Sequence, residues 1–240
     1  MEKRILEYKD GPETFSGYLA KASTPKKKKP AVLIAHAWAG KSPFECAKAE
    51  LLASWGYVGF AADLYGKDVL GTSREENTKL MSPFMENRAK IVDRLEIALT
   101  HLKDQEDVDE NRVAAIGFCF GGLCVLDLAR NNSQVQGVAS FHGLLNGPQQ
   151  SKRHDPIKPR VLVLHGHEDP MVPAQQVLDF QDEMTKYQAD WQIHTYGRTL
   201  HSFTNPEAND KDFGTVYNAQ SSERSLKTLR SFLEEIFSED

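Results

Sequence analysis

A short glycine-rich segment carries a cysteine in a position where it could act as a nucleophile. Residues 114–125 read AAIGFCFGGLCV, and within them Gly117, Cys119 and Gly121 give the pattern G-x-C-x-G. This is the form of the nucleophile elbow, a tight strand-to-helix turn, with cysteine in place of serine. The start of the following helix would favour a thiolate there. The same pattern also suits a packed junction around a buried cysteine, so the motif alone leaves both interpretations open.

Two side chains that could complete a catalytic triad follow at the ends of later predicted strands. Asp169 lies in the turn GHEDP, and His201 lies in the loop YGRTLHSF after the next strand. The order cysteine, acid, histidine is that of α/β-hydrolases and differs from the order used on other folds. His167 and Glu168 are close in sequence, but Asp169 lies deepest in its turn. This order, more than the glycine-rich motif, predicts a triad of Cys119, Asp169 and His201.

Backbone amides near the cysteine are candidates for binding an oxyanion. The N–H of Phe120 follows the cysteine directly, and a second donor is expected in the loop after an earlier strand. Residues 36–40, HAWAG, form such a loop, and the N–H of Trp38 is the candidate donor. His36 and His142 also stand at strand ends. Each either lines the pocket or is buried with its hydrogen bonds satisfied.

The remaining cysteines and histidines do not indicate a second kind of chemistry. Cys46 and Cys124 fall on predicted helices and are expected in the core, and His165 lies within an apolar run. The histidines form no i, i+4 pair and no H-E-x-x-H pattern, which disfavours a metal site. The sequence has neither a P-loop nor G-x-G-x-x-G, so we expect no metal and no cofactor.

The elements that must position these residues alternate between strands and helices. Strands are predicted over residues 3–8, 14–20, 31–36, 57–63, 112–117, 135–143, 160–166 and 191–196, and helices over residues 42–56, 86–104, 120–130, 173–188 and 222–237. Residues 64–85 and 143–159 are predicted as irregular connections. This alternation favours an α/β fold with a mostly parallel, twisted sheet of about eight strands and helices on both faces. We expect a single domain over residues 1–240.

Composition and charge restrict the class of protein further. The chain has 240 residues, 40% of them hydrophobic, and a formal net charge of −5, which disfavours a nucleic-acid partner. Three cysteines do not suggest a disulfide framework, so reduced thiols and a cytoplasmic location are expected. No window approaches the roughly 18 consecutive apolar residues of a membrane span. The lysine-rich stretch 24–30 is expected to be a solvated loop, with a targeting or polyanion patch as the alternative.

Five segments together resemble the dienelactone hydrolase family. They are LIAHAWAG (33–40), GYVGFAADLYG (56–66), IGFCFGG (116–122), LHGHEDPMVP (164–173) and YGRTLHSF (196–203). They run in order across nearly the whole chain, and their combination is specific to the family. The resemblance implies the α/β-hydrolase fold, with Cys119 as nucleophile, His201 as base and acid, and Asp169 as orienting carboxylate. It also implies that the amides of Trp38 and Phe120 bind the oxyanion.

The sequence departs from the family pattern at two positions that concern the substrate. Ala37 stands where dienelactone hydrolases carry a glutamate that contacts the resting cysteine. Asn205 stands where they carry an arginine that binds the substrate carboxylate. Arg74 and Arg88 are both available for a second substrate-binding arginine. The resemblance therefore carries the catalytic machinery over to this chain but not the namesake substrate.

These observations predict a cysteine-dependent hydrolase of lactones or activated carboxylic esters that works through a thioacyl-enzyme. Its partner would be a small-molecule ester or lactone, and the chain is expected to be a monomer or a small homo-oligomer. Without a carboxylate at Ala37, we expect Cys119 and His201 to be in contact in the resting enzyme. One alternative is a general esterase, thioesterase or acyltransferase on the same triad. Another is a non-hydrolytic ligand-binding or redox-sensing protein that uses Cys119.

Overall fold

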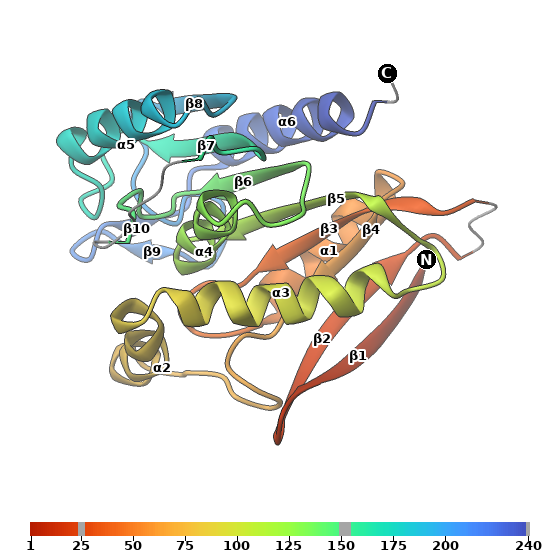
Figure 1. Ribbon diagram of the computed structural model, residues 1–240. Coiled ribbons are helices and arrows are strands. Elements are labelled where there is room, and N and C mark those ends of the chain that lie inside the picture. The colour runs from red at the N-terminus through yellow and green to blue at the C-terminus, as the bar shows by residue number, and fades with distance from the viewer. Residues whose placement is uncertain (24–26, 149–154, 239–240) are drawn as a thin grey trace. The chain divides into compact units, whose positions relative to one another are not determined.

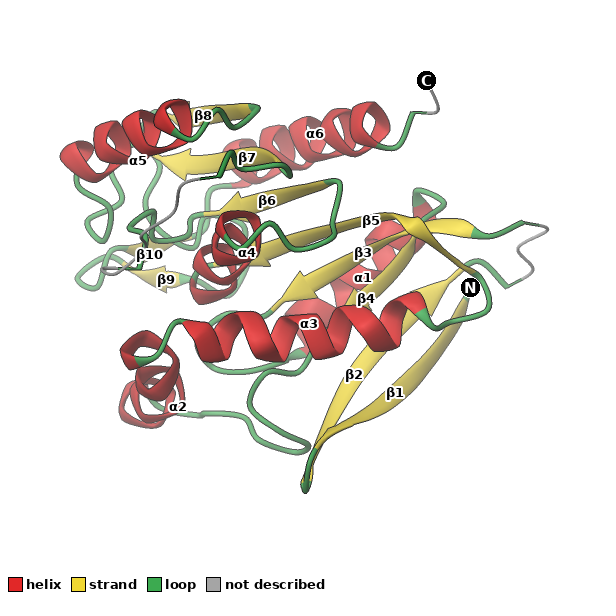
Figure 2. Cartoon of the chain, in the orientation of Figure 1, coloured by secondary structure: helices red, strands yellow, loops and turns green. Residues whose placement is uncertain are grey.

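The computed structural model describes residues 1–23, 27–148 and 155–238, shown in Figure 1. Most of the lysine-rich stretch is described, but its residues 24–26 lie outside these ranges, as do residues 149–154 of the second predicted connection. The chain divides into two compact units, Met1–Ile116 and Gly117–Asp240, and each is described by itself. The expectation of a single domain stays a prediction. Within both units strands and helices alternate along the chain (Figure 2).

The first unit begins with a β-hairpin. Strands β1 (Glu2–Asp10) and β2 (Glu13–Lys21) pair antiparallel around a turn in which Gly11 has a φ of 56°. The unit also contains β3 (Lys29–Ala35), β4 (Val58–Ala61) and most of β5 (Val108–Phe118). The strand order is β1-β2-β4-β3-β5, in which β2 runs antiparallel and β3 parallel to β4. The strands predicted over residues 3–8 and 14–20 thus pair with each other, and parallel pairing begins with β3 and β4.

Two helices pack on the strands of the first unit. Helix α1 (Pro43–Ser54) packs against β2, β3 and β4, and helix α3 (Ala89–Lys103) packs against β1 and β3. Figure 1 shows α3 in front of these strands and α1 behind them. The longer helix buries apolar residues at helical spacing: Ile91, Leu95, Ala98, Leu99 and Leu102.

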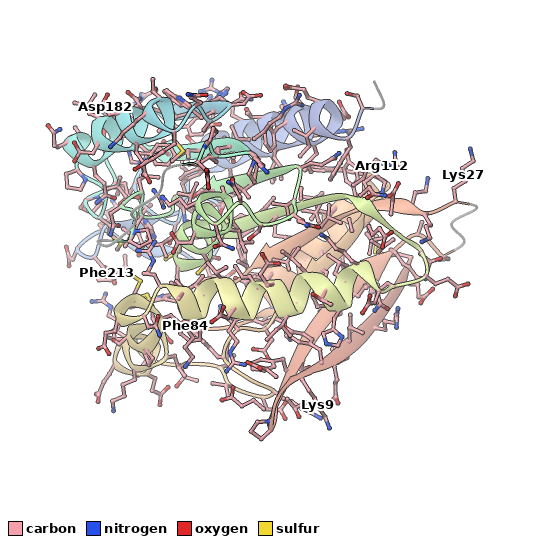
Figure 3. All side chains as sticks on the ribbon, in the orientation of Figure 1. Lys9, Lys27, Phe84, Arg112, Asp182 and Phe213 are labelled. Atoms are coloured by element: carbon pink, nitrogen blue, oxygen red, sulfur yellow. The ribbon has the colours of Figure 1, made fainter. Side chains whose placement is uncertain are left out.

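The connection predicted as irregular over residues 64–85 contains a helix, which corrects that prediction. Helix α2 (Arg74–Glu86) begins after Ser73, whose side chain accepts a hydrogen bond from the backbone N–H of Glu76. Asn77 and Phe84 are its buried residues, and Phe84 is labelled in Figure 3. The segment has no apolar periodicity that would signal a helix, and it contains a proline, which usually disfavours one.

The second unit continues the alternation. Its parallel strands are β6 (Gly137–Phe141), β7 (Arg160–Gly166) and β8 (Trp191–Tyr196), and its helices are α4 (Phe120–Arg130), α5 (Ala174–Lys186) and α6 (Ala219–Ile236). Phe232 of α6 lies directly over Gly137, whereas Ser140 of β6 lies against Gly122 of α4. Alternate residues of a strand point to opposite faces, so helices cover both faces of β6.

The strands β1 to β8 account for the predicted number of about eight, and most of them are parallel. A second, two-stranded sheet is formed by β9 (Asn209–Asp210) and β10 (Thr215–Val216), which the sequence did not suggest. Strands of two residues are too short to show an alternating pattern. Among the described residues, no helix combines the length and the apolar character needed to cross a membrane.

Candidate active site

The turn around Cys119 has the strained geometry that a nucleophile elbow requires. Strand β5 ends at Phe118 and α4 begins at Phe120, so Cys119 is the residue between them, with a φ of 55°. Left-handed backbone is unusual for a residue with a side chain. A Cβ atom at Gly117 would lie 2.0 Å from the carbonyl oxygen of Gly121, which explains why glycine is needed there. The Cys119 side chain is half-buried.

Asp169 and His201 form a buried hydrogen-bonded pair. The distance from His201 Nδ1 to Asp169 Oδ2 is 2.7 Å, and both side chains are almost fully buried. The other carboxylate oxygen of Asp169 accepts a hydrogen bond from the backbone N–H of Met171 at 2.9 Å. His167 and Glu168 are exposed, whereas Asp169 is buried, which agrees with the choice of Asp169 from its place in the turn. The pairing fixes the Nδ1 proton toward the carboxylate and leaves Nε2 for chemistry.

The small hairpin of β9 and β10 holds the backbone of His201. Its N–H donates to the carbonyl of Gly214, and its carbonyl accepts a hydrogen bond from the N–H of Val216, both at 3.0 Å. His201 also forms a bridge with Thr215. The ring of Pro170, next to Asp169, lies where a side chain at Gly214 would be. The histidine is therefore fixed through both its ring and its backbone.

The electrostatic surroundings of His201 favour its protonated form. Burial lowers the pKa of His201, but the interactions of the ring with Cys119 and Asp169 outweigh burial and raise the pKa to about 10. Nε2 is buried and has no hydrogen bond of standard geometry among the described residues. Cys119 is thus close enough to influence His201 electrostatically, while the direct contact expected in the resting enzyme stays a prediction.

The residues predicted for the site in the first unit, His36, Ala37 and Trp38, lie in a loop that several hydrogen bonds hold. His36 is buried, with Nδ1 2.7 Å from the carbonyl of Ala37 and Nε2 accepting the N–H of Leu64 at 3.2 Å. The buried carboxylate of Glu45 accepts the N–H of Ala37 at 3.1 Å. The carbonyl of Trp38 accepts a hydrogen bond from the Tyr65 hydroxyl. These contacts correspond to the hydrogen-bonded alternative for His36, and the oxyanion role of Trp38 stays a prediction.

The residues considered for substrate binding lie on different elements. Asn205 is half-buried, and its side-chain oxygen accepts the backbone N–H of Glu207 at 3.1 Å, which stabilises a local turn. Arg74 is exposed at the start of α2, and Arg88 is half-buried just before α3. The choice between the two arginines stays open.

The other thiols and histidines contribute no second centre to the described part of the chain. All three cysteines are free, and Cys124 is buried as predicted, whereas Cys46 is only half-buried. Burial raises the pKa of the Cys46 thiol, so it is a poor nucleophile. His165 is buried, and burial lowers its pKa. Among the described residues, no group of three or more histidine, cysteine, aspartate or glutamate side chains is arranged to hold a metal ion.

Sequence reasoning missed three features around these residues. The β9–β10 hairpin that holds His201 has no periodic signal. Thr204, three residues after His201, hydrogen-bonds His142 and follows no motif that would single it out. Glu45 had a local signal, because Ser42 and Glu45 have the spacing of a capping box before an apolar helix. Its further bond to Ala37 depends on the folded loop.

Comparison with known proteins identifies the family. A sequence model of the dienelactone hydrolase family matches residues 15–237. The chain belongs to this family. It is therefore a carboxylic ester hydrolase with the α/β-hydrolase fold, as the resemblance implied.

Similar proteins agree with this assignment. A putative carboxymethylenebutenolidase of Aquifex aeolicus is 29% identical over 213 residues, which cover 86% of this chain and 89% of the relative. The solved structure of a protein named m3DLH superposes with a TM-score of 0.93 at 34% identity, covering 99% of both chains. The dienelactone hydrolase-like promiscuous phosphotriesterase P91, from metagenomic libraries, has a TM-score of 0.91 at 30% identity, again over 99% of both chains.

Proposed function

We propose that this dienelactone hydrolase-family protein hydrolyses lactones or activated carboxylic esters through a thioacyl intermediate on Cys119. The observation that carries the proposal is the buried Asp169–His201 pair beside a cysteine on a left-handed turn. The raised pKa of His201 favours the protonated ring, and in this proposal the imidazolium stabilises a thiolate on Cys119. Thiolate and imidazolium are the resting forms that an attack by sulfur requires.

In the acylation step, the Cys119 sulfur attacks the carbonyl carbon of the ester. The carbonyl electrons move to oxygen, and the oxyanion accepts hydrogen bonds from the amide of Phe120, the first residue of α4, and from that of Trp38. One such donor is worth about 3–4 kcal/mol of transition-state stabilisation. The intermediate collapses, the C–O bond breaks, and the Nε2 proton of His201 passes to the leaving alkoxide.

In the deacylation step, His201 is neutral and takes a proton from water as the water oxygen attacks the thioester carbon. Collapse of the second intermediate releases the acid and returns Cys119 as thiolate beside protonated His201. Asp169 keeps the imidazole in the tautomer whose Nε2 faces the reaction. Thiolates expel alkoxides more readily than amines, so esters and lactones should be turned over in preference to amides.

The test compares the wild type with Cys119→Ala, Cys119→Ser and, as a matched control, Cys46→Ala. We expect Cys119→Ala to lose ester turnover by on the order of 10³-fold or more, and Cys46→Ala to retain it. Mass spectrometry of the wild type quenched during turnover of p-nitrophenyl acetate should find an acetyl group on the peptide that contains Cys119. Turnover by Cys119→Ala within tenfold of the wild type would refute the proposal, because a tenfold loss corresponds to only about 1.4 kcal/mol of activation free energy.

The same proteins separate the alternative activities. A panel of a dienelactone, a chromogenic ester, an acyl thioester and an ester offered with an alcohol acceptor distinguishes lactonase, esterase, thioesterase and acyltransferase. A redox-sensing role would instead give a Cys119–Cys124 disulfide after mild peroxide and no turnover of any ester. Burial of Cys124 inside α4 disfavours that disulfide.

A second candidate activity comes from one similar protein. P91, whose structure superposes with a TM-score of 0.91 and of which this chain covers 99%, is described as a promiscuous phosphotriesterase. Attack by the Cys119 sulfur on phosphorus would release an aryloxide and leave a thiophosphate ester for water to hydrolyse. Paraoxon as substrate tests this activity, and burst release of p-nitrophenol that is absent in Cys119→Ala would support it.

A further inference from the structure

We propose that His142 is a positioning residue that fixes the nucleophile turn to the loop of His201. The inference rests on the proposed role of Cys119. His142 directly follows β6 and is buried, and its own N–H donates to the carbonyl of Leu164 in β7 at 2.9 Å. Its φ of 40° is in the left-handed region, which costs a histidine free energy. Such strain persists only where neighbouring groups fix the residue, and the contacts of the ring show which groups these are.

One ring nitrogen of His142 binds the backbone of Cys119. The N–H of Cys119 lies 3.1 Å from His142 Nδ1 and 3.0 Å from the carbonyl oxygen of Phe141, so both accept from the same donor. A backbone N–H can only donate, so Nδ1 must carry a lone pair. His142 is therefore neutral, with its proton on Nε2.

The other ring nitrogen of His142 reaches the loop that carries His201. His142 Nε2 lies 2.8 Å from Thr204 Oγ1, and with the proton on Nε2 the histidine donates to the threonine. The hydroxyl is buried, so this bond is not in competition with bulk water. One ring thus links Cys119 to a residue three positions after His201.

The same ring also packs on the side of the imidazole of His201. The two ring centroids are 5.1 Å apart with an interplanar angle of 65°, and Phe203 packs on the His142 ring at 5.2 Å in a similar edge-on manner. The two ring nitrogens of His142 lie within hydrogen-bond distance of the Cys119 N–H and the Thr204 hydroxyl. His142 acts through Cys119 and the His201 loop, by holding the sulfur at the correct distance from the base.

Two amide variants separate this role from that of an ordinary buried histidine. His142→Asn places an oxygen near the position of Nδ1, where it can accept from Cys119, and asparagine tolerates the left-handed φ. His142→Gln places its amide near the position of Nε2, where it keeps the contact to Thr204 and loses the one to Cys119. His142→Leu removes both contacts. His194→Asn, on the exposed part of β8, is the control for a histidine replacement.

The experiment measures ester turnover and the rate at which iodoacetamide alkylates Cys119, in a Cys46→Ala background that removes the half-buried competing thiol. We expect His142→Gln and His142→Leu to lower kcat by about 10- to 100-fold and to slow alkylation, with KM changed less than about threefold. His142→Asn should stay within about threefold of the background protein in both measurements. Thermal unfolding identifies any variant that fails to fold.

Equal losses in the Asn and Gln variants would overturn the proposal, because the histidine would then matter only for packing. Unchanged alkylation in His142→Gln would overturn it as well. If His142→Leu does not fold, the Asn and Gln pair decides alone. The alkylation rate needs no substrate, so it tests His142 even if Cys119→Ala retains ester turnover and the proposed function fails.

Discussion

Two buried histidines, one in each unit, have pKa values that are shifted in opposite directions. His36 after β3 and His201 before β9 are both almost fully inaccessible to solvent. Burial lowers the pKa of His36, and the charges of Glu45 and Asp63 do not compensate for it. Burial also lowers the pKa of His201, but Cys119 and Asp169 raise it to about 10.

The difference lies in what each ring nitrogen contacts. Both nitrogens of His36 bind backbone groups, and one of these is the donating N–H of Leu64, which requires a neutral ring. His201 instead binds the carboxylate of Asp169 directly, and its interaction with Cys119 raises its pKa as well. Burial alone therefore does not indicate chemistry. A buried histidine with anionic partners and an unused nitrogen does.

The largest loss of activity should come from removing the carboxylate of Asp169 that is paired with His201. Asp169→Asn keeps the shape of the side chain but no longer stabilises the Nδ1–H tautomer or the imidazolium. We expect ester turnover to fall by about 10³- to 10⁴-fold, measured as kcat with p-nitrophenyl acetate. Glu168→Gln, one residue earlier and exposed, is the matched control and should stay near wild type. Full activity of Asp169→Asn would mean that the carboxylate partner of His201 does not set it apart from His36.

The second prediction concerns the charge of Cys119. Because the interaction with Cys119 raises the pKa of His201, replacing the thiol group by a hydroxyl in Cys119→Ser should lower that pKa from about 10 by roughly 1–3 units. The pKa of His36 is set by burial and by nearby groups such as Glu45 and Asp63, so it should stay unchanged in the same protein. NMR titration of the histidine ring signals measures both. If the pKa of His201 stays unchanged in Cys119→Ser, the sulfur does not carry the negative charge that raises it.

The third prediction tests the carboxylate of the first unit as a structural group. Glu45 accepts hydrogen bonds from Ala37 and from both the backbone N–H and the hydroxyl of Ser42. Glu45→Gln weakens these charge-assisted bonds and should lower the free energy of unfolding by about 1–3 kcal/mol. Urea unfolding measures the loss. The exposed Glu75→Gln on α2 should change stability by less than about 0.5 kcal/mol, and an equal effect of both would contradict the structural role of Glu45.

The smallest effect should be a pH dependence of stability due to His36. Its pKa is lowered on folding, so below about pH 6.5 the unfolded chain binds the proton more readily than the folded one. Stability should therefore fall on acidification by at most about 1.4 kcal/mol per pH unit from this group. His36→Gln keeps an acceptor for Leu64 that does not titrate. Urea unfolding measures the free energy of unfolding of both proteins at about pH 7.5 and pH 5.5. The advantage of the wild type over His36→Gln should be smaller at the lower pH. An advantage that stays constant would argue against a neutral His36.

The fold could be predicted wherever a segment has a clear period or a clear boundary. The strand predicted over residues 160–166 and the helix predicted over residues 42–56 correspond to β7 and α1. Helix α2 and the β9–β10 hairpin could not be predicted, because neither segment has a clear apolar period of its own. Local sequence reports on burial along one element and not on pairing between distant ones.

In the site, too, the sequence does not show which distant residues contact one another. Chain order singles out Asp169 and His201, which the structure brings into a hydrogen bond. His36 and His142 look alike in sequence, since each follows a buried strand. Their partners, Leu64 and Thr204, are 28 and 62 residues away, and no spacing rule relates such residues. The pKa of His36 is lowered by burial, which arises only in the folded chain and has no signature in the residue spacing.

The attachment of His201 to β10 has a consequence for how substrate preference can change. The carbonyl of Gly214 and the N–H of Val216 hold the histidine backbone, so residues 205–213 form a segment whose far end is fixed next to His201. Exchanges in the turn between β9 and β10, residues 211–213, keep the strand pairing and both hydrogen-bond partners of His201. That turn is the part of the chain next to His201 that can vary while the backbone of the histidine stays anchored.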